Sequence, residues 1–231
     1  MTNLMTEKTV AENYEKEVRE RLINGTKFYH GSDQKFTKFE LRNYGKNGVA
    51  GGRGIYITSS RKFADQYTGK NDKTGYLYQV SFKPGRELSA KKLTLTKKEV
   101  SRYVTILDRK YNYLENWGDV EFEGRQTVKN EAVSELMEGN SNDVDLYNEV
   151  INEVGGQPEA LHALRQVDHF THSIVPHDES RSDYDEVVVL NPNDLKIRKM
   201  ETRAPKQNLT RDLKAGIQGI GGISLKTNLT R

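Results

Sequence analysis

Apolar residues recur every four positions near the start of the chain. Val10, Tyr14, Val18 and Leu22 follow this spacing, and Glu, Lys and Arg hold most positions between them. This pattern predicts an amphipathic helix over residues 8–24, ended by Asn24-Gly25. We expect the helix to pack on one side of a domain.

Strict alternation marks two later stretches as strands. Residues 26–30 form a short strand candidate in which Phe28 and His30 point the same way. Aromatic and apolar residues at 76, 78, 80 and 82 then predict a half-buried strand, which Pro84-Gly85 ends. Between these strands, Ser59 or Ser60 begins a short predicted helix that carries Phe63, Ala64 and Tyr67.

The pattern becomes helical over about 96–170. Thr96 is a suitable cap for a run with apolar residues at 100, 103, 104, 107, 111 and 114. A polar segment from Trp117 to Asn130 comes next, followed by predicted helices at 131–138, at 143–154 and from Pro158 onward. The segment around His169 to His177 is loop-like in its pattern.

Strand signals return in the last part of the sequence. A β-branched run at 186–190 precedes an Asn-Pro-Asn turn, and 195–200 forms a last predicted strand. Strands therefore bracket a helical insertion without β-α-β alternation. We expect an α+β fold, which argues against a doubly wound nucleotide fold. The expected parts are a helix over 1–25, a domain over 26–202 and a partly flexible extension over 203–231.

Composition limits the possible classes of protein. The 231 residues are 30% charged and 34% hydrophobic, with no cysteine, which excludes disulfides, thiolate metal sites and thiol nucleophiles. No apolar run is long enough for a membrane span, and the charged N-terminus is unlike a signal peptide. We expect a soluble cytoplasmic protein that does not bind membranes.

The net charge of +3 is unevenly distributed. From residue 203 onward six Lys or Arg stand against Asp212 alone, so the tail carries +5 and residues 1–202 about −2. The body of the protein thus gives no support to nucleic-acid binding, whereas the tail is either a solvated end or a docking arm for nucleic acid or an acidic partner.

A glycine-rich segment over 45–54 leads into Tyr56. It has neither the Gly-Lys-Ser/Thr of a Walker loop nor the G-x-G-x-x-G spacing. Glycines before a strand allow close backbone approach to a ligand, and Tyr56 would present a flat ring there. An ordinary turn and strand is the alternative interpretation.

Three short stretches collect polar residues beside turns: Tyr29-His30-Gly31-Ser32, Arg53-Gly54-Ile55-Tyr56 and Asp185-Glu186-Val187-Val188-Val189. His30 and Tyr56 taken singly suit structural roles as well as a site. Glu186 is more telling, because burying an acid beside an apolar run is costly without a partner or a function.

In this order the three stretches resemble the ADP-ribosyltransferase superfamily in its His-Tyr-Glu branch, which includes poly(ADP-ribose) polymerases, diphtheria-type toxins and transferase domains of phage and mobile elements. Tyr67, eleven residues after Tyr56, and the turn after residue 190 fit the same pattern, and the resemblance spans about residues 26–200. It implies a split β-sandwich of two short sheets with NAD as the substrate in the cleft, and no metal.

The resemblance also implies site residues. His30 would bond the adenosine ribose, Gly31 backbone groups would hold the nicotinamide amide, Tyr56 and Tyr67 would stack on the nicotinamide ring, and Glu186 would bond the nicotinamide ribose. The catalytic candidates are Glu186, His30 and Tyr56, and the NAD-binding candidates are His30, Gly31, Ser32, Arg53, Tyr56, Ser60 and Tyr67.

Two positions depart from relatives. Ala64 stands where many eukaryotic members place a serine, for which Ser59 or Ser60 would substitute. Tyr184 stands where arginine-modifying relatives carry an acid or Gln, so an arginine acceptor is not supported.

The expected activity is transfer of ADP-ribose from NAD to a macromolecular acceptor, a host protein if the chain is phage-encoded. Hydrolysis of NAD is one alternative, and a non-catalytic binding or phage-structural module is another. A metal cluster of His169, His172 and His177 is a weaker hypothesis, because their spacing fits no common site. The segment 178–183 is expected near the cleft, where it would shape acceptor choice, and the helical insertion is expected to be a lid, a recognition module or neither. The sequence leaves the oligomeric state open.

Overall fold

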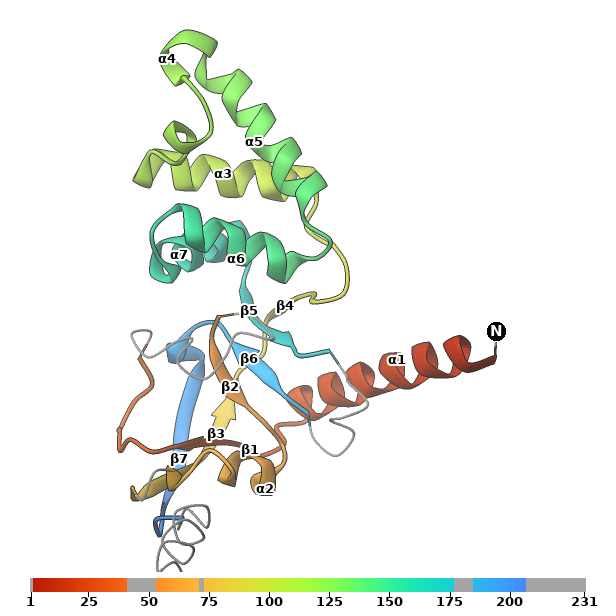
Figure 1. Cartoon of the computed structure of the whole chain (residues 1–231), viewed down its shortest axis with the longest axis vertical. Helices are drawn as coiled ribbons and strands as arrows, with labels where there is room; N and C mark the ends of the chain where they lie inside the picture. Colours follow the sequence, from red (N-terminus) through yellow and green to blue (C-terminus); the bar gives the residue numbers. More distant parts are fainter. Residues whose placement is uncertain (1, 41–52, 71–72, 177–184, 207–231) are drawn as a thin grey trace, which may run out of the picture.

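The computed structural model describes residues 2–40, 53–70, 73–176 and 185–206 (Figure 1). The N-terminal helix α1 (Thr2–Ile23) lies at one side and the short helix α2 (Arg61–Asp65) beside the strands. Most of the predicted glycine-rich loop, the segment 178–183 and nearly all of the basic tail lie outside the described residues. Within the described ranges, no helix is long and apolar enough to cross a membrane.

Seven strands form two sheets, as a split β-sandwich requires. The first sheet is antiparallel in the order β1 (Phe28–Ser32), β3 (Gly75–Phe82), β7 (Leu195–Arg203). The second has the order β2 (Ile55–Ile57), β6 (Val187–Val189), β5 (Phe170–Ile174), β4 (Arg86–Leu88). The predicted α+β class is confirmed.

The core between the sheets follows the predicted alternation. Tyr78 and Val80 of β3 are buried together with Val18 and Leu22 of α1, and Tyr76 and Phe82 pack against them. Alternate residues of a strand share one face, so these four positions of β3 cover the same side of the first sheet. Helix α1 is thereby held to the sheets by its apolar stripe.

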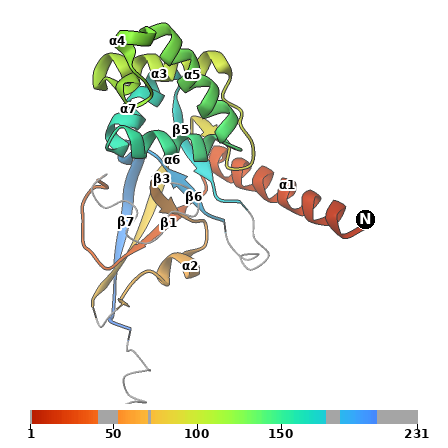
Figure 2. The same ribbon diagram turned by 45° about the horizontal axis from the view of Figure 1, so that its top comes forward.

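A helical module connects β4 to β5. It contains α3 (Lys97–Tyr111), the 3₁₀ turn η3 (Tyr113–Asn116), α4 (Val120–Glu123), α5 (Arg125–Gly139), α6 (Asp143–Glu153) and α7 (Gln157–Val167). These helices form a layer of their own, in which α6 and α7 lie between the sheets and α3 and α5 (Figures 1 and 2). The module encloses a second apolar core.

Local signals were sufficient for α3. Thr96 caps the helix by accepting from the backbone N–H of Glu99, whose carboxylate accepts in return from the backbone N–H of Thr96. This reciprocal capping box satisfies two N–H groups that a helix start leaves unpaired. The predicted polar segment up to Asn130 is wrong, because α4 begins at Val120 and α5 at Arg125.

Two strands escaped prediction. Strand β5 is buried at all five positions, yet three of them are Thr171, His172 and Ser173, so no apolar alternation marks it. Strand β4 has three residues, two of them charged. The loop expected around His172 is therefore wrong. Because β4 and β5 pair in parallel, the helical module is also a β-α-β crossover, contrary to expectation.

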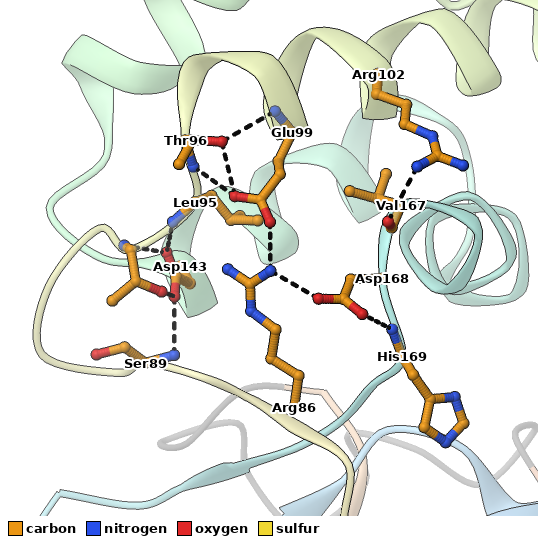
Figure 3. Close-up of polar contacts among 11 residues, drawn as sticks. Arg86, Ser89, Leu95, Thr96, Glu99, Arg102, Asp143, Val167, Asp168 and His169 are labelled. Atoms are coloured by element: carbon orange, nitrogen blue, oxygen red, sulfur yellow. Dashed lines mark hydrogen bonds and ion pairs between the residues drawn. The ribbon is translucent and has the colours of Figure 1, made fainter.

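Two carboxylates join the module to the strands (Figure 3). Arg86 of β4 binds Glu99 of α3 and also Asp168 before β5, the latter at 2.8 Å. Asp143, fully buried at the start of α6, accepts from the backbone N–H groups of Ser89, Thr94 and Leu95 at 3.0, 2.6 and 3.0 Å. A buried carboxylate with several donors is well compensated, so it fixes the crossover from β4 into the module.

The short 3₁₀ turn η5 (Pro192–Asp194) leads from β6 into β7, where the sequence predicts an Asn-Pro-Asn turn.

Candidate active site

The two sheets meet at β1 and the end of β2. Tyr29 and Thr58 exchange both backbone hydrogen bonds, at 2.7 and 3.0 Å. This bridge brings the next side chain, His30, to the backbone of Tyr56, whose carbonyl oxygen lies 2.8 Å from Nδ1. Two of the three motif residues therefore meet at what we call the sheet junction.

The junction determines the protonation of His30. A carbonyl oxygen only accepts, so Nδ1 carries the proton and donates it to Tyr56. Burial lowers the pKa of His30, and Phe36, Phe39 and Tyr78 surround its ring. The imidazole is thus neutral at pH 7, and Nε2 is left with a lone pair that suits a hydroxyl donor.

Gly31 is required by a close approach of α2. A Cβ atom at this position would lie 1.9 Å from the carbonyl oxygen of Ala64 and 3.1 Å from Cβ of Tyr67. Only glycine permits this distance. The approach places Tyr67, just after α2, beside the residue that follows His30.

The α2 residues have structural partners. Ser60 caps α2, its hydroxyl accepting from the backbone N–H of Phe63 at 3.2 Å. Ala64 is buried at 2% exposure against β1. Tyr67 contacts Phe63 edge to face, with ring centroids 5.4 Å apart, and Lys70 lies over its ring at 4.6 Å.

Strand pairing relates Tyr56 to Glu186. In the β2–β6 pair Tyr56 is opposite Val188, while Ile55 and Ile57 are opposite Val189 and Val187 and pack with them into the core. Directly opposed residues share a face, so Tyr56 and Val188 are on the other face of the sheet. Glu186, two residues before Val188 and 8% exposed, belongs to the same alternation.

Asp185 is a structural residue of the site to which the sequence analysis assigned no role. It is 2% exposed, and its Oδ1 accepts from the backbone N–H of Ser59 at 2.9 Å and from the Ser59 hydroxyl. Its Oδ2 lies 3.4 Å from Nε of Arg21 in α1. Asp185 therefore ties the start of β6 to the end of β2 and to the N-terminal helix.

Helix α1 also contacts the backbone of Glu186. The Glu186 N–H points to the hydroxyl of Tyr14 at 3.4 Å, and the Glu186 carbonyl accepts from Val175 at 3.0 Å. Burial raises the pKa of Tyr14 to about 12, so the phenol stays protonated. Tyr14 and Arg21 were missed as site residues because the helical pattern explains Tyr14 as packing and Arg21 as a surface charge.

Comparison with known families agrees with this geometry. A family model described as ADP-ribosyltransferase in polyvalent proteins matches residues 24–202, more than three quarters of the chain. The chain belongs to this family. The match supports the superfamily resemblance and the fold, and NAD is the substrate of such domains. No curated protein and no solved structure gave a match.

The matched region of the transferase domain begins at Asn24, directly after α1. Arg21 and Tyr14 precede it, although both contact the Asp185-Glu186 pair. The N-terminal helix therefore contributes to the site from outside the family domain.

The remaining candidates of the transferase domain lie at its edges. Ser32 ends β1, and its hydroxyl accepts from the backbone N–H of Gln34 at 3.0 Å. Arg53 donates to the side-chain carbonyl of Asn152 in α6 at 2.6 Å, which links the start of β2 to the helical module. The structure thus gathers His30, Gly31, Tyr56 and Tyr67 at the junction, and gives Arg53 a contact with the module.

The histidines considered for a metal do not form a cluster. His172 is buried in β5, bonded to the Thr171 hydroxyl at 3.0 Å and packed edge to face on Phe82, and burial lowers its pKa to about 4. His169 is exposed, and His177 lies outside the described residues. In the ranges that the structure covers, no three His, Asp or Glu residues are placed to bind a metal ion.

Proposed function

We propose that this protein is an NAD-dependent ADP-ribosyltransferase of the His-Tyr-Glu type, with Glu186, His30 and Tyr56 as its catalytic residues. The single observation that carries the proposal is the 2.8 Å bond from His30 to the Tyr56 backbone. It joins two motif residues that lie 26 positions apart, on the sheet whose next strand begins after Glu186.

His30 and the aromatic residues hold NAD. Neutral His30 presents Nε2 as an acceptor for the adenosine ribose hydroxyl, and Gly31 leaves its backbone accessible for the nicotinamide amide. Tyr56 and Tyr67 stack on the nicotinamide ring, since offset aromatic contacts suit a flat heterocycle and exclude water.

Glu186 acts on the ribose. The bond between ribose C1 and the nicotinamide nitrogen breaks with both electrons going to nitrogen, which turns the pyridinium into neutral nicotinamide. Positive charge develops on the sugar, as in glycoside cleavage, and a fixed carboxylate stabilises it selectively in the transition state. The acceptor attacks C1 and loses its proton.

The acceptor in this proposal is a macromolecule, a protein of the host, and the reaction takes place in the cytoplasm. The evidence for the transferase class is the family membership. The acceptor and the compartment rest on the sequence resemblance and on the composition.

The test is Glu186→Gln. We expect nicotinamide release to fall about 100-fold or more, the scale of losing one key electrostatic group, with NAD affinity retained. Glu153→Gln is the matched control, because Glu153 is a half-buried carboxylate of α6, bonded to Tyr113 and remote from the junction. Equal nicotinamide release from wild type and Glu186→Gln would remove Glu186 from the mechanism.

Product analysis separates transfer from its alternatives. Incubation of a host lysate with labelled NAD, followed by mass spectrometry, should give labelled macromolecules that are absent with Glu186→Gln. Free ADP-ribose as the sole product would indicate a glycohydrolase. Absence of nicotinamide release from wild-type protein would indicate a non-catalytic module.

A further inference from the structure

A groove of about 470 Å³ lies on the helical module, bordered by α3, α5 and α7. Neither His30, Tyr56 nor Glu186 lines it, and α6 and α7 lie between α3 and the sheets (Figure 1). Its lining is rich in hydrogen-bond donors and contains no acidic side chain. The polar lining includes four cations and two hydroxyl groups: Lys98, Arg102, Arg109, Lys129, Ser101 and Thr105.

Helix α3 fixes the row of cations. Its opposite face carries Val100, Tyr103, Val104 and Leu107, all buried in the core of the module. The rotation of the helix is therefore set, and residues 98, 102 and 109 follow one another along the outer side. At 1.5 Å per residue the row is about 16 Å long, enough for several phosphates spaced as in one strand of a duplex.

The groove arginines differ from the other arginines of the module. Arg86, Arg125 and Arg165 each pair with a carboxylate. Among the described residues, neither Arg102 nor Arg109 has such a partner, and Arg102 reaches only the Val167 carbonyl at 3.4 Å (Figure 3).

This concentration of positive charge is unfavourable in the free protein. Lys98 and Arg102 are like charges four residues apart on one helix, a spacing that destabilises a helix. An anion in the groove would relieve the repulsion.

We propose that this groove binds the phosphodiester backbone of a nucleic-acid strand. Cationic, hydroxyl and amide donors are the groups that contact phosphate oxygens in such complexes, and this lining has all three. No aromatic side chain lines the groove, so bases have no stacking platform and binding is independent of base sequence. An acidic peptide is favoured less, because Ile106 is the one aliphatic side chain in the lining.

The groove changes the interpretation of the charge of the body. A net charge of about −2 over residues 1–202 argues against nucleic-acid binding only while the charges are evenly spread. Folding places four cations together. The proposal is independent of the proposed function, since binding requires no NAD.

The test compares three double charge reversals in the full chain. The groove variant is Arg102→Glu/Arg109→Glu. The module control, Lys92→Glu/Lys97→Glu, changes two exposed lysines outside the groove, and the tail control is Arg211→Glu/Lys214→Glu. Each reversal changes the net charge equally. Circular dichroism checks folding, and Arg102→Gln/Arg109→Gln is a milder second groove variant.

Binding of a fluorescent 16-nucleotide single strand is measured by anisotropy between 50 and 200 mM salt. We expect the groove variant to lose at least about tenfold in affinity, and its salt slope to decrease by about 1.4, or 0.7 for each phosphate contact. The module control should bind like wild type, and oligonucleotides of different base sequence should bind alike.

Three outcomes would overturn the proposal. One is the absence of binding by the wild-type chain. Another is an equal loss in the groove variant and in either control, which would indicate attraction to net charge or to the tail. The last is displacement by polyglutamate at an equal concentration of charges, which would assign the groove to acidic proteins.

Discussion

The helical module of residues 89–167 and the sheet junction are stabilised by different kinds of contact. The module packs four helices around a continuous apolar core, and its polar contacts secure the edges. The junction depends on single polar contacts between segments far apart in sequence, such as His30 with Tyr56 and Asp185 with Ser59. Because apolar packing is spread over many residues whereas the junction contacts are few, stability and chemistry should be separable by mutation.

The largest effect on stability is expected at the joint between the two regions. Asp143→Ala leaves three backbone N–H groups, those of Ser89, Thr94 and Leu95, without their acceptor. We expect a loss of about 3 kcal/mol or more in the free energy of unfolding, because unpaired buried donors retain their desolvation cost. Urea denaturation measures it.

This variant tests whether the regions are independent. Nicotinamide release per folded molecule should remain within about twofold of wild type, since no atom of the junction changes. Asp145→Ala, an exposed neighbour on α6, is the control and should cost less than about 1 kcal/mol. A large loss of activity in folded Asp143→Ala would show that the module and the junction act as one unit.

Acid should destabilise the protein through His172 in β5, the strand that connects the module to the sheets. Burial, with a further effect from the charge of Arg19, lowers the pKa of His172 to about 4. Below pH 6.5 the unfolded chain takes up a proton that the native state refuses, so stability falls from pH 6.5 to about 4 and is constant above this window. The loss is about 3 kcal/mol for a shift of this size.

Denaturation curves at pH 7.5 and 4.5 measure this dependence. His172→Gln, which cannot titrate, should lose less stability between these pH values than wild type. The control is His162→Gln, since His162 is exposed on α7. An identical pH dependence of wild type and His172→Gln would assign the acid sensitivity to other groups, such as His30.

The smallest effect is expected from the contact of α1 with the site. Tyr14→Phe removes the hydroxyl that accepts from the Glu186 backbone N–H at 3.4 Å. Slight displacement of Glu186 should lower kcat for nicotinamide release roughly two- to fivefold, or about 0.5–1 kcal/mol, with KM for NAD unchanged. Tyr111→Phe in α3 is the control. A change in KM alone would mean that Tyr14 supports NAD binding rather than the position of Glu186.

Sequence patterns determined the elements whose signals are local. The capping box at Thr96, the apolar face of α3, the alternation of β3 and the cap at Ser60 each depend on residues within one element. The ordered set of His30, Tyr56 and Glu186 was also visible, because each follows a characteristic short motif. These signals were enough for the fold class and for the family.

Tertiary structure alone decided the rest, because the deciding contacts join residues far apart in sequence. Strand β5 exists through burial between β4 and β6, not through its own apolar content. Tyr14, Arg21 and Asp185 support the site only because α1 packs against the start of β6. The basic groove needs α3, α5 and α7 side by side, and a sum of charges along the chain cannot show where folding places them.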